Sequence, residues 1–247
     1  MSRIVCSATL IAAAFSLVLF AGAGKAASQE YMDGMIEPYL EVNISSQAPG
    51  VIDEVLVERG DVVKKGQVVA KLRAGVEKAD VELAEAQVAF SKRKLGRNEE
   101  LFAKEDISAN ERDELETDLK KGEAILEEAK AKLEMRDIRS TVDGVVVKRE
   151  LAAGEYVGEK PILTIAQINP LNVEVVAPVR RYGSITRGML AEVRPEAPVG
   201  GSYTGRVVIV DRVVDAASGT FGIRVELPNV SMALPAGLKC RVRFYKK

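Results

Sequence analysis

An interrupted internal repeat constrains the fold of this chain more than any other feature. Residues 48–69 recur, with a shift of 94 positions, as residues 142–163. The aligned positions are Gly50 with Gly144, Gly60-Asp61 with Gly154-Glu155, Val63 with Val157, and Val68-Val69 with Ile162-Leu163. Each copy reads as short β-branched strands separated by glycine turns. Neither half can bury its apolar face alone, so the sequence predicts one small, flattened β-barrel assembled from both halves.

The segment between the two copies predicts a pair of helices. Residues 76–136 contain no Pro and only two glycines, Gly96 and Gly122, and they are rich in Ala, Glu, Lys and Leu. These residue types favour helix, and the apolar positions recur at helical spacing. We expect one helix from about residue 76 to residue 103 and a second from about residue 109 to residue 136.

Heptad spacing predicts that the helices fold back on each other around Asp106 as an antiparallel coiled coil. The expected seams are Val76, Ala79, Leu83, Ala86, Phe90, Arg93 and Arg97 in the first helix, and Leu115, Leu119, Gly122, Leu126, Ala129, Leu133 and Arg136 in the second. Phe90 then faces Gly122, so that a large side chain opposes a small one. Ser108 and Glu111 have the spacing of a capping box at the start of the second helix.

A second apolar row on the first helix predicts a partner surface. Its members recur every seven residues and are expected on the side away from the seam: Val81, Val88, Leu95 and Phe102. In an isolated hairpin such a row would face water, which is typical of an interaction site. We expect these four side chains to make hairpin–hairpin contacts in a ring of copies.

After the second copy of the repeat, alternating apolar and polar residues predict an antiparallel β-barrel. The expected strands are residues 171–179, 189–194, 203–214, 220–227 and 239–245, separated by turns rich in Pro and Gly. Pro170 is expected to mark the domain boundary. A further strand at residues 35–44 is expected to join the same sheet before the chain enters the first half-repeat.

The N-terminus has the pattern of a secretory signal. Arg3 precedes the apolar run Leu10–Phe20, and small residues at Gly24 and Ala26 predict cleavage after Ala26. The run is shorter than the roughly 20 residues of a membrane span, although an uncleaved anchor is the alternative. Cleavage would leave Cys240 as the only thiol, so no intramolecular disulfide is expected.

Composition argues against several function classes. The chain has 35 Lys and Arg against 36 Asp and Glu, and it has no His and no Trp. A nucleic-acid partner is not expected without a basic excess, and the lack of His removes the commonest proton shuttle and metal ligand. No Gly-rich phosphate loop follows a strand. We expect neither an enzyme nor a cofactor.

Two narrower alternatives remain. A biotinyl or lipoyl carrier would present a lysine in the turn between its halves, but helices replace that turn here, and Lys71 and Lys78 lie near the junction. A metal-handling protein would use soft ligands such as methionine, and only Met32 and Met35 are close in sequence.

The order of these segments resembles the membrane-fusion, or periplasmic adaptor, proteins of tripartite efflux and secretion systems (the HlyD/RND adaptor family). The resemblance is carried by APGVIDEVLVERGDVVKKGQVVAKL, by STVDGVVVKRELAAGEYV and by VVDAASGTFGIRVELPN. It implies a mostly β fold with a helical insertion. The implied parts are a signal peptide (1–26), a strand joining the barrel (27–44), the first lipoyl half-motif (45–74), the α-helical hairpin (75–138), the second half-motif (139–169) and the β-barrel domain (170–247).

The hairpin tip resembles adaptors that dock onto TolC-like outer-membrane channels. Those adaptors carry an Arg, a Leu four residues on and a Ser seven further, matched here by Arg97, Leu101 and Ser108 within RNEELFAKEDIS. The resemblance implies that these three bind the channel. Taken alone, Arg97 also reads as the end of the seam and Ser108 as a helix cap.

The resemblance implies a periplasmic adaptor that links an inner-membrane transporter, of RND or ABC type, to a TolC-like channel for export of small molecules. It implies a homo-oligomeric ring, trimeric or hexameric, and no cofactor. The alternatives are a metal-efflux adaptor that also binds cation and a type I secretion adaptor. Larger family members have a further membrane-proximal domain, which we expect to be absent or vestigial here.

Overall fold

The computed structural model describes residues 30–102 and 109–245, and the residues from Tyr31 onward form one compact unit. Two separate apolar cores lie within this unit. The strands are β1 (Met32–Ile44), β2 (Gly50–Val55), β3 (Val62–Val63), β4 (Val68–Leu72), β5 (Asp137–Arg139), β6 (Gly144–Arg149), β7 (Tyr156–Val157), β8 (Leu163–Pro178), β9 (Leu190–Pro195), β10 (Tyr203–Val210), β11 (Thr220–Leu227) and β12 (Lys239–Tyr245). The helices are α1 (Gly75–Phe102), α2 (Ala109–Glu134) and the short 3-10 turn Val179–Arg181.

The two halves of the repeat exchange strands. In the first half, β2 pairs with β7 of the second half, and β3 pairs with β6 in the equivalent manner. The backbone N–H of Gly60 donates to Val146 and that of Gly154 donates to Ile52, each at 2.9 Å. These two bonds are related by the 94-residue shift, so each half completes the hydrogen bonding of the other.

Equivalent turns repeat the same side-chain contact. The backbone N–H of Glu58 donates to the Asp61 carboxylate at 2.8 Å, and the N–H of Ala152 donates to Glu155 at 2.7 Å. Each turn contains a glycine with positive φ: Gly60 at +98° in the first turn and Gly154 at +89° in the second. Residues with a Cβ rarely adopt this conformation. The sequence repeat is therefore also a repeat of structure.

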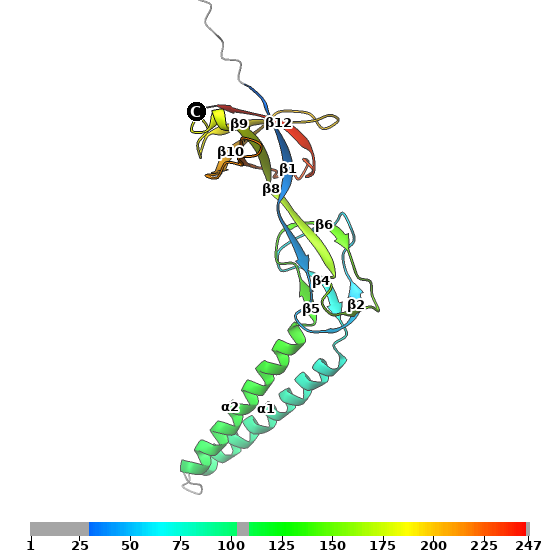
Figure 1. The fold of residues 1–247 in the computed structure, drawn as a ribbon. Coiled ribbons are helices and arrows are strands. Elements are labelled where there is room, and N and C mark those ends of the chain that lie inside the picture. Colours follow the sequence, from blue (N-terminus) through cyan, green and yellow to red (C-terminus); the bar gives the residue numbers. More distant parts are fainter. Residues whose placement is uncertain (1–29, 103–108, 246–247) are drawn as a thin grey trace, which may run out of the picture. The chain divides into compact units, whose positions relative to one another are not determined.

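Strands β1 and β8 run through both cores. They pair antiparallel from Gly34 opposite Val175 to Ile44 opposite Leu163, and Figure 1 shows them side by side. Pro170, expected as a domain boundary, lies inside β8. Strand β8 continues through this position and pairs with β1 on both sides of it, while the two cores divide there, with Ile165 in one and Leu171 in the other.

The C-terminal strands close a barrel. The order of strands is β1-β12-β9-β10-β11-β8, and the pairing of β1 with β8 joins its ends. Alternate residues of every strand point inward, as in β11, where Phe221, Ile223, Val225 and Leu227 are buried. Cys240 of β12 is among the buried residues, and burial raises the pKa of its thiol to about 11.

Helices α1 and α2 lie side by side as an antiparallel hairpin between the two half-repeats (Figure 1). The predicted fold class is confirmed: a mostly β chain with a helical hairpin inserted into a split β-domain, followed by a β-barrel. Within residues 30–102 and 109–245, neither helix is both long enough and apolar enough to cross a bilayer.

Candidate partner-binding surface on the helical hairpin

The β-domain fixes where the hairpin begins and ends. Strands β4 and β5 pair antiparallel, with Ala70 opposite Ile138, so the chain leaves β4 and returns to β5 at neighbouring positions. The backbone N–H of Leu72 donates to the carbonyl of Arg136 at 2.9 Å, which extends this pairing to the foot of the hairpin. The helices therefore begin and end next to a hydrogen-bonded strand pair.

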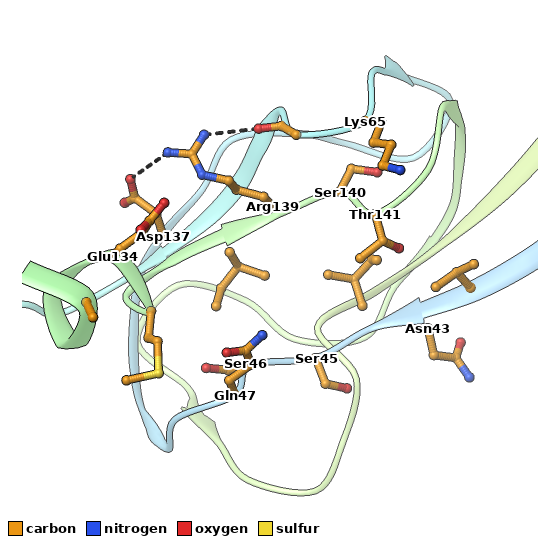
Figure 2. Close-up of a pocket in the computed structure, with 16 residues that line it drawn as sticks. Asn43, Ser45, Ser46, Gln47, Lys65, Glu134, Asp137, Arg139, Ser140 and Thr141 are labelled. Carbon is orange, nitrogen blue, oxygen red and sulfur yellow. Dashed lines mark hydrogen bonds and ion pairs between the residues drawn. The ribbon is translucent and has the colours of Figure 1, made fainter. Parts of the chain in front are cut away.

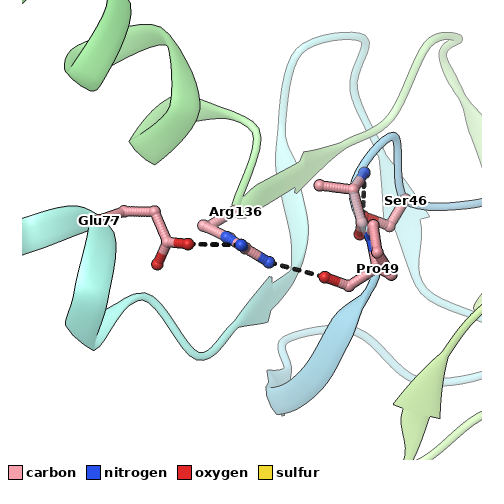
Figure 3. A network of polar contacts seen from close by, with 5 residues as sticks. Ser46, Pro49, Glu77 and Arg136 are labelled. Atoms are coloured by element: carbon pink, nitrogen blue, oxygen red, sulfur yellow. Dashed lines mark hydrogen bonds and ion pairs between the residues drawn. The ribbon is translucent and has the colours of Figure 1, made fainter.

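Arg136 fastens the hairpin to the β-domain. Its guanidinium forms an ion pair with Glu77 in the first turn of α1 and donates to the carbonyl of Pro49 at 2.9 Å (Figure 3). The side chains of Arg136 and Glu77 are only 20% and 14% exposed, so water screens this pair less than a surface pair. A Cβ on Gly50 would lie 2.9 Å from the guanidinium nitrogen, so a side chain there would displace it.

The seam of α2 is the one that its heptad spacing predicts. Leu115 and Ala129 are 7% exposed and Gly122 is buried. Leu119, Leu126 and Leu133 are half-buried in the same row.

The predicted seam of α1 is wrong. The side chains that face α2 are Val81, Ala84, Val88, Ser91 and Leu95, of which Ala84 and Ser91 are 5% and 8% exposed. A Cβ on Gly122 would lie 3.5 Å from a methyl group of Val88, not against Phe90. The residues predicted to form the seam instead face outward: Val76 and Leu83 are each 71% exposed, and Phe90 is 50% exposed.

This exchange of faces also changes the position of the predicted partner row. Val81, Val88 and Leu95 are half-buried on the side of α1 that faces α2, and the side chain of Phe102 lies outside the described residues. A role of this row in contacts between copies stays a prediction. Both apolar rows repeat every seven residues, so their period alone does not choose between them. Contacts at the base of the hairpin determine which row faces α2. Arg136 forms an ion pair with Glu77, and Ala84 and Ser91 follow Glu77 at intervals of seven, so they lie on the same side of α1.

The predicted docking residues are only partly described. Arg97 is exposed on α1. Leu101 belongs to the last turn of α1, but its side chain is not described, and Ser108 lies outside the described residues. Their joint role at the tip stays a prediction.

A cleft of about 870 Å³ lies at the foot of the hairpin, between the end of β1 and β5 (Figure 2). Val42, Ile44, Met135 and Ile138 supply its apolar lining. Arg139 on its wall is already engaged, because it lies 3.5 Å from Asp137 and donates to the Gly66 carbonyl at 3.0 Å. The arrangement offers packing surface rather than a convergent set of reactive groups.

The methionine pair proposed as soft metal ligands does not converge. Met32 is 6% exposed and packs in the barrel core, whereas Met35 is 43% exposed. Residues three apart on a strand point to opposite faces. Over the described parts of the chain, no cluster of three or more His, Cys, Asp or Glu residues is placed to hold a metal ion.

The sequence did not predict the contacts of Arg136 with Glu77 and Pro49 that attach the hairpin to the β-domain. The heptad pattern predicts Arg136 as the last seam residue, and it predicts no role for Glu77 or Gly50 in fixing the hairpin. Arg136 and Glu77 are separated by 59 positions, and only the ladder of β4 and β5 brings them together. The one signal present was Gly50, whose place in the repeat marks a position of close approach.

Comparison with known families decides the identity of this architecture. Residues 40–167 match the family described as "CzcB-like, barrel-sandwich hybrid domain", and residues 171–247 match the "CusB-like, beta-barrel domain". The chain belongs to the periplasmic adaptor, or membrane fusion protein, family. This family consists of structural linkers rather than enzymes.

Individual relatives are distant. The chain is 24% identical over 212 residues to an uncharacterized protein of Haemophilus influenzae, covering 85% of this chain and 56% of the relative. It is 23% identical over 223 residues to the multidrug resistance protein MexA of Pseudomonas aeruginosa, covering 84% and 58%. This adaptor therefore spans less than two thirds of the length of these relatives.

Solved structures show the same fold. A MacA–MexA chimeric protein that contains the Pseudomonas aeruginosa MexA α-hairpin domain matches with a TM-score of 0.74 at 20% identity, covering 88% of this chain and 82% of that one. The membrane fusion protein Spr0693 of Streptococcus pneumoniae matches with a TM-score of 0.69 at 18% identity, covering 88% and 99%.

Proposed function

We propose that this chain is a periplasmic adaptor that joins an inner-membrane transporter to a TolC-like outer-membrane channel during export of small molecules. The observation that carries the proposal is the hairpin. Two helices of 28 and 26 residues leave the split β-domain where Arg136 contacts Glu77 and Pro49, and they place the tip far along the hairpin from that junction. At about 1.5 Å per residue, the tip stands roughly 40 Å from the foot.

The proposed location is the periplasm, reached through the N-terminal signal at residues 1–26. Energy for export comes from the transporter, because the adaptor supplies only structural coupling. The β-barrel and the split β-domain would assemble in a ring of copies on that transporter. The pull-down described below also captures the inner-membrane transporter. Its identification shows whether the transporter is of the RND type, of the ABC type or part of a type I secretion system.

A pull-down from detergent-solubilised membranes tests the proposal. The full chain carrying an affinity tag is compared with Leu101→Asp, because a carboxylate on the tip should be costly to bury in an apolar docking site. We expect wild type to capture an outer-membrane channel, and we expect the variant to lose at least about 90% of it.

Val213→Asp is the matched control, because it also replaces an apolar side chain with aspartate. Val213 is 81% exposed and lies in the barrel domain, away from the hairpin. It should capture as much channel as wild type. Equal recovery of the channel by Leu101→Asp would remove the tip assignment of Arg97, Leu101 and Ser108. If wild type captured no outer-membrane channel, the adaptor function itself would be wrong.

A further inference from the structure

The cleft at the foot of the hairpin has the size and the lining of a small-molecule site. Its volume is about 870 Å³, and pockets that bind drug-sized ligands have volumes of about 300–1,000 Å³ and mainly apolar walls. Three of its apolar side chains, Val42, Ile44 and Ile138, belong to the core of the split β-domain or pack against it. Their packing in that core holds the apolar lining in place.

The end of the cleft next to α2 is negatively charged. Helix α2 ends at Glu134, which is exposed and lines the cleft. The C-terminal end of a helix carries partial negative charge, so a carboxylate there is unfavourable and a cation is favourable. Asp137 lines the same end of the cleft (Figure 2). Two carboxylates and a helix C-terminus thus lie beside an apolar surface.

The basic side chains close to this end in sequence do not neutralise it fully. Arg139 lies 3.5 Å from the carboxylate of Asp137 and offsets part of its charge. Lys132, two residues before Glu134, forms an ion pair with Glu128 at 2.7 Å. Within the described parts of the chain, the Glu134 carboxylate forms no ion pair. This carboxylate is therefore available to a positively charged ligand.

We infer that this cleft binds an amphipathic organic cation, with its apolar body on the apolar lining and its positive charge beside Glu134. Lys65 lies toward the opposite end of the cleft, near Thr141 (Figure 2), so the two ends differ in charge. The α2 end has two carboxylates and a helix terminus, whereas the opposite end has one ammonium group. The cleft therefore favours a cation over an anion of the same shape.

This site goes beyond the adaptor function proposed above, which needs structural coupling alone. The assignment of the ligand as cargo rests on that proposed function. If the adaptor takes part in the export of small molecules, the cleft binds those that combine an apolar body with a positive charge.

Calorimetric titration of the full chain with two ions of the same shape tests the preference for a cation. Tetraphenylphosphonium and tetraphenylborate are both apolar and similar in size, and they differ in the sign of their charge. We expect the phosphonium ion to bind, and we expect the borate ion to bind at least about tenfold more weakly. Equal affinity for both ions would overturn the assignment of a cation. A phosphonium ion that does not bind would overturn the site itself.

Two substitutions in the lining locate the site. Glu134→Gln should weaken binding of the phosphonium ion about fivefold, which is the effect of losing one partly exposed ion pair. Met135 lines the cleft and is 37% exposed. Met135→Lys should weaken binding more than about tenfold, because it adds a positive charge where the cation binds.

Glu123→Gln and Val213→Lys are the matched controls. Glu123 is exposed on α2, about 16 Å along the helix from Glu134, and Val213 is 81% exposed in the barrel domain. Both controls should bind the phosphonium ion like wild type, and far-UV circular dichroism should show the same helix content in all four variants. Unchanged binding by Glu134→Gln and by a folded Met135→Lys would overturn the inference.

The outcomes separate this inference from the proposed function. If the phosphonium ion does not bind while wild type captures the outer-membrane channel, the adaptor function stands and only the ligand site fails. If binding depends on Glu134 but no channel is captured, the ligand site stands and the adaptor function fails.

Discussion

At the residue scale, one carboxylate organises the outer face of the barrel. Glu192 accepts hydrogen bonds from Ser202 at 2.8 Å, from Arg194 at 2.7 Å and from Arg243 at 2.6 Å. Tyr31 stacks among the cations, with the guanidinium of Arg194 5.3 Å from the centre of its ring. Arg194 lies directly opposite Arg241 across β9 and β12. Like charges in that position repel, so Glu192 stabilises a strand pair that would otherwise be unfavourable.

These contacts predict a pH-dependent contribution to stability. The hydrogen bonds from Ser202 and Arg194, supported by Arg243, hold the pKa of the Glu192 carboxyl at about 2 instead of 4.5. Because folding lowers this pKa, the contacts of the ionised Glu192 carboxylate stabilise the fold above pH 4.5. That stabilisation is lost as the carboxylate becomes protonated between pH 4.5 and pH 2. We expect Glu192→Gln to lower the melting temperature at pH 7, and the difference from wild type to shrink between pH 5 and pH 2. A gap that stays constant over this range would contradict the assignment.

At the element scale, the hairpin holds together through small residues. Ala84, Ser91 and Gly122 occupy buried positions where the two helices meet, while Leu83 and Phe90 remain outside. Larger side chains pack around these small ones, among them Leu115 on α2 and the half-buried Val88 and Leu95 on α1. Because most helical stability in proteins comes from tertiary packing, the contacts along this seam support both helices.

Gly122 provides a sharp test of the observed seam. A Cβ there would meet Val88 at 3.5 Å, an ordinary contact, so Gly122→Ala should raise hairpin stability by about 0.5–1 kcal/mol through its higher helix propensity. Gly122→Leu should lower stability by about 1–3 kcal/mol by overpacking. Thermal melts followed at 222 nm measure both. Equal effects of Ala and Leu would show that Gly122 does not face α1.

At the scale of the whole molecule, the hairpin and the β-domain are energetically distinct. Neither apolar core contains a residue of α1 or α2. The half-repeats bind each other directly through β2–β7 and β3–β6. The hairpin touches the β-domain chiefly through its foot at Arg136.

Replacing residues 75–136 with a short glycine-containing turn should therefore leave both cores folded. β4 and β5 already pair antiparallel, so a hairpin turn can join them. We expect a cooperative thermal transition and the β-type circular dichroism of the intact chain, together with complete loss of channel capture. A chain that fails to fold would show that the helices are needed to bring the half-repeats together.

The sequence by itself determined the order of the parts. The 94-residue repeat, the proline-free segment and the alternating C-terminal runs each carry their periodicity locally, so the split β-domain, the two helices and the barrel strands were all predictable. Helix α1 begins within a residue of its predicted start, and α2 ends within two residues of its predicted end. The seam of α2 was predictable as well, because that helix has only one apolar row.

Tertiary structure decided the rotation of α1 and the continuity of β8. Helix α1 has two apolar rows with the same period, and the pair formed by Arg136 and Glu77 turns the smaller residues inward. That pair joins positions 59 apart and exists only because β4 and β5 set the foot of the hairpin. Pro170 stays within a strand because β1 pairs with β8 on both sides of it. Local periodicity selects the elements, whereas contacts between distant residues select which face of each element is buried.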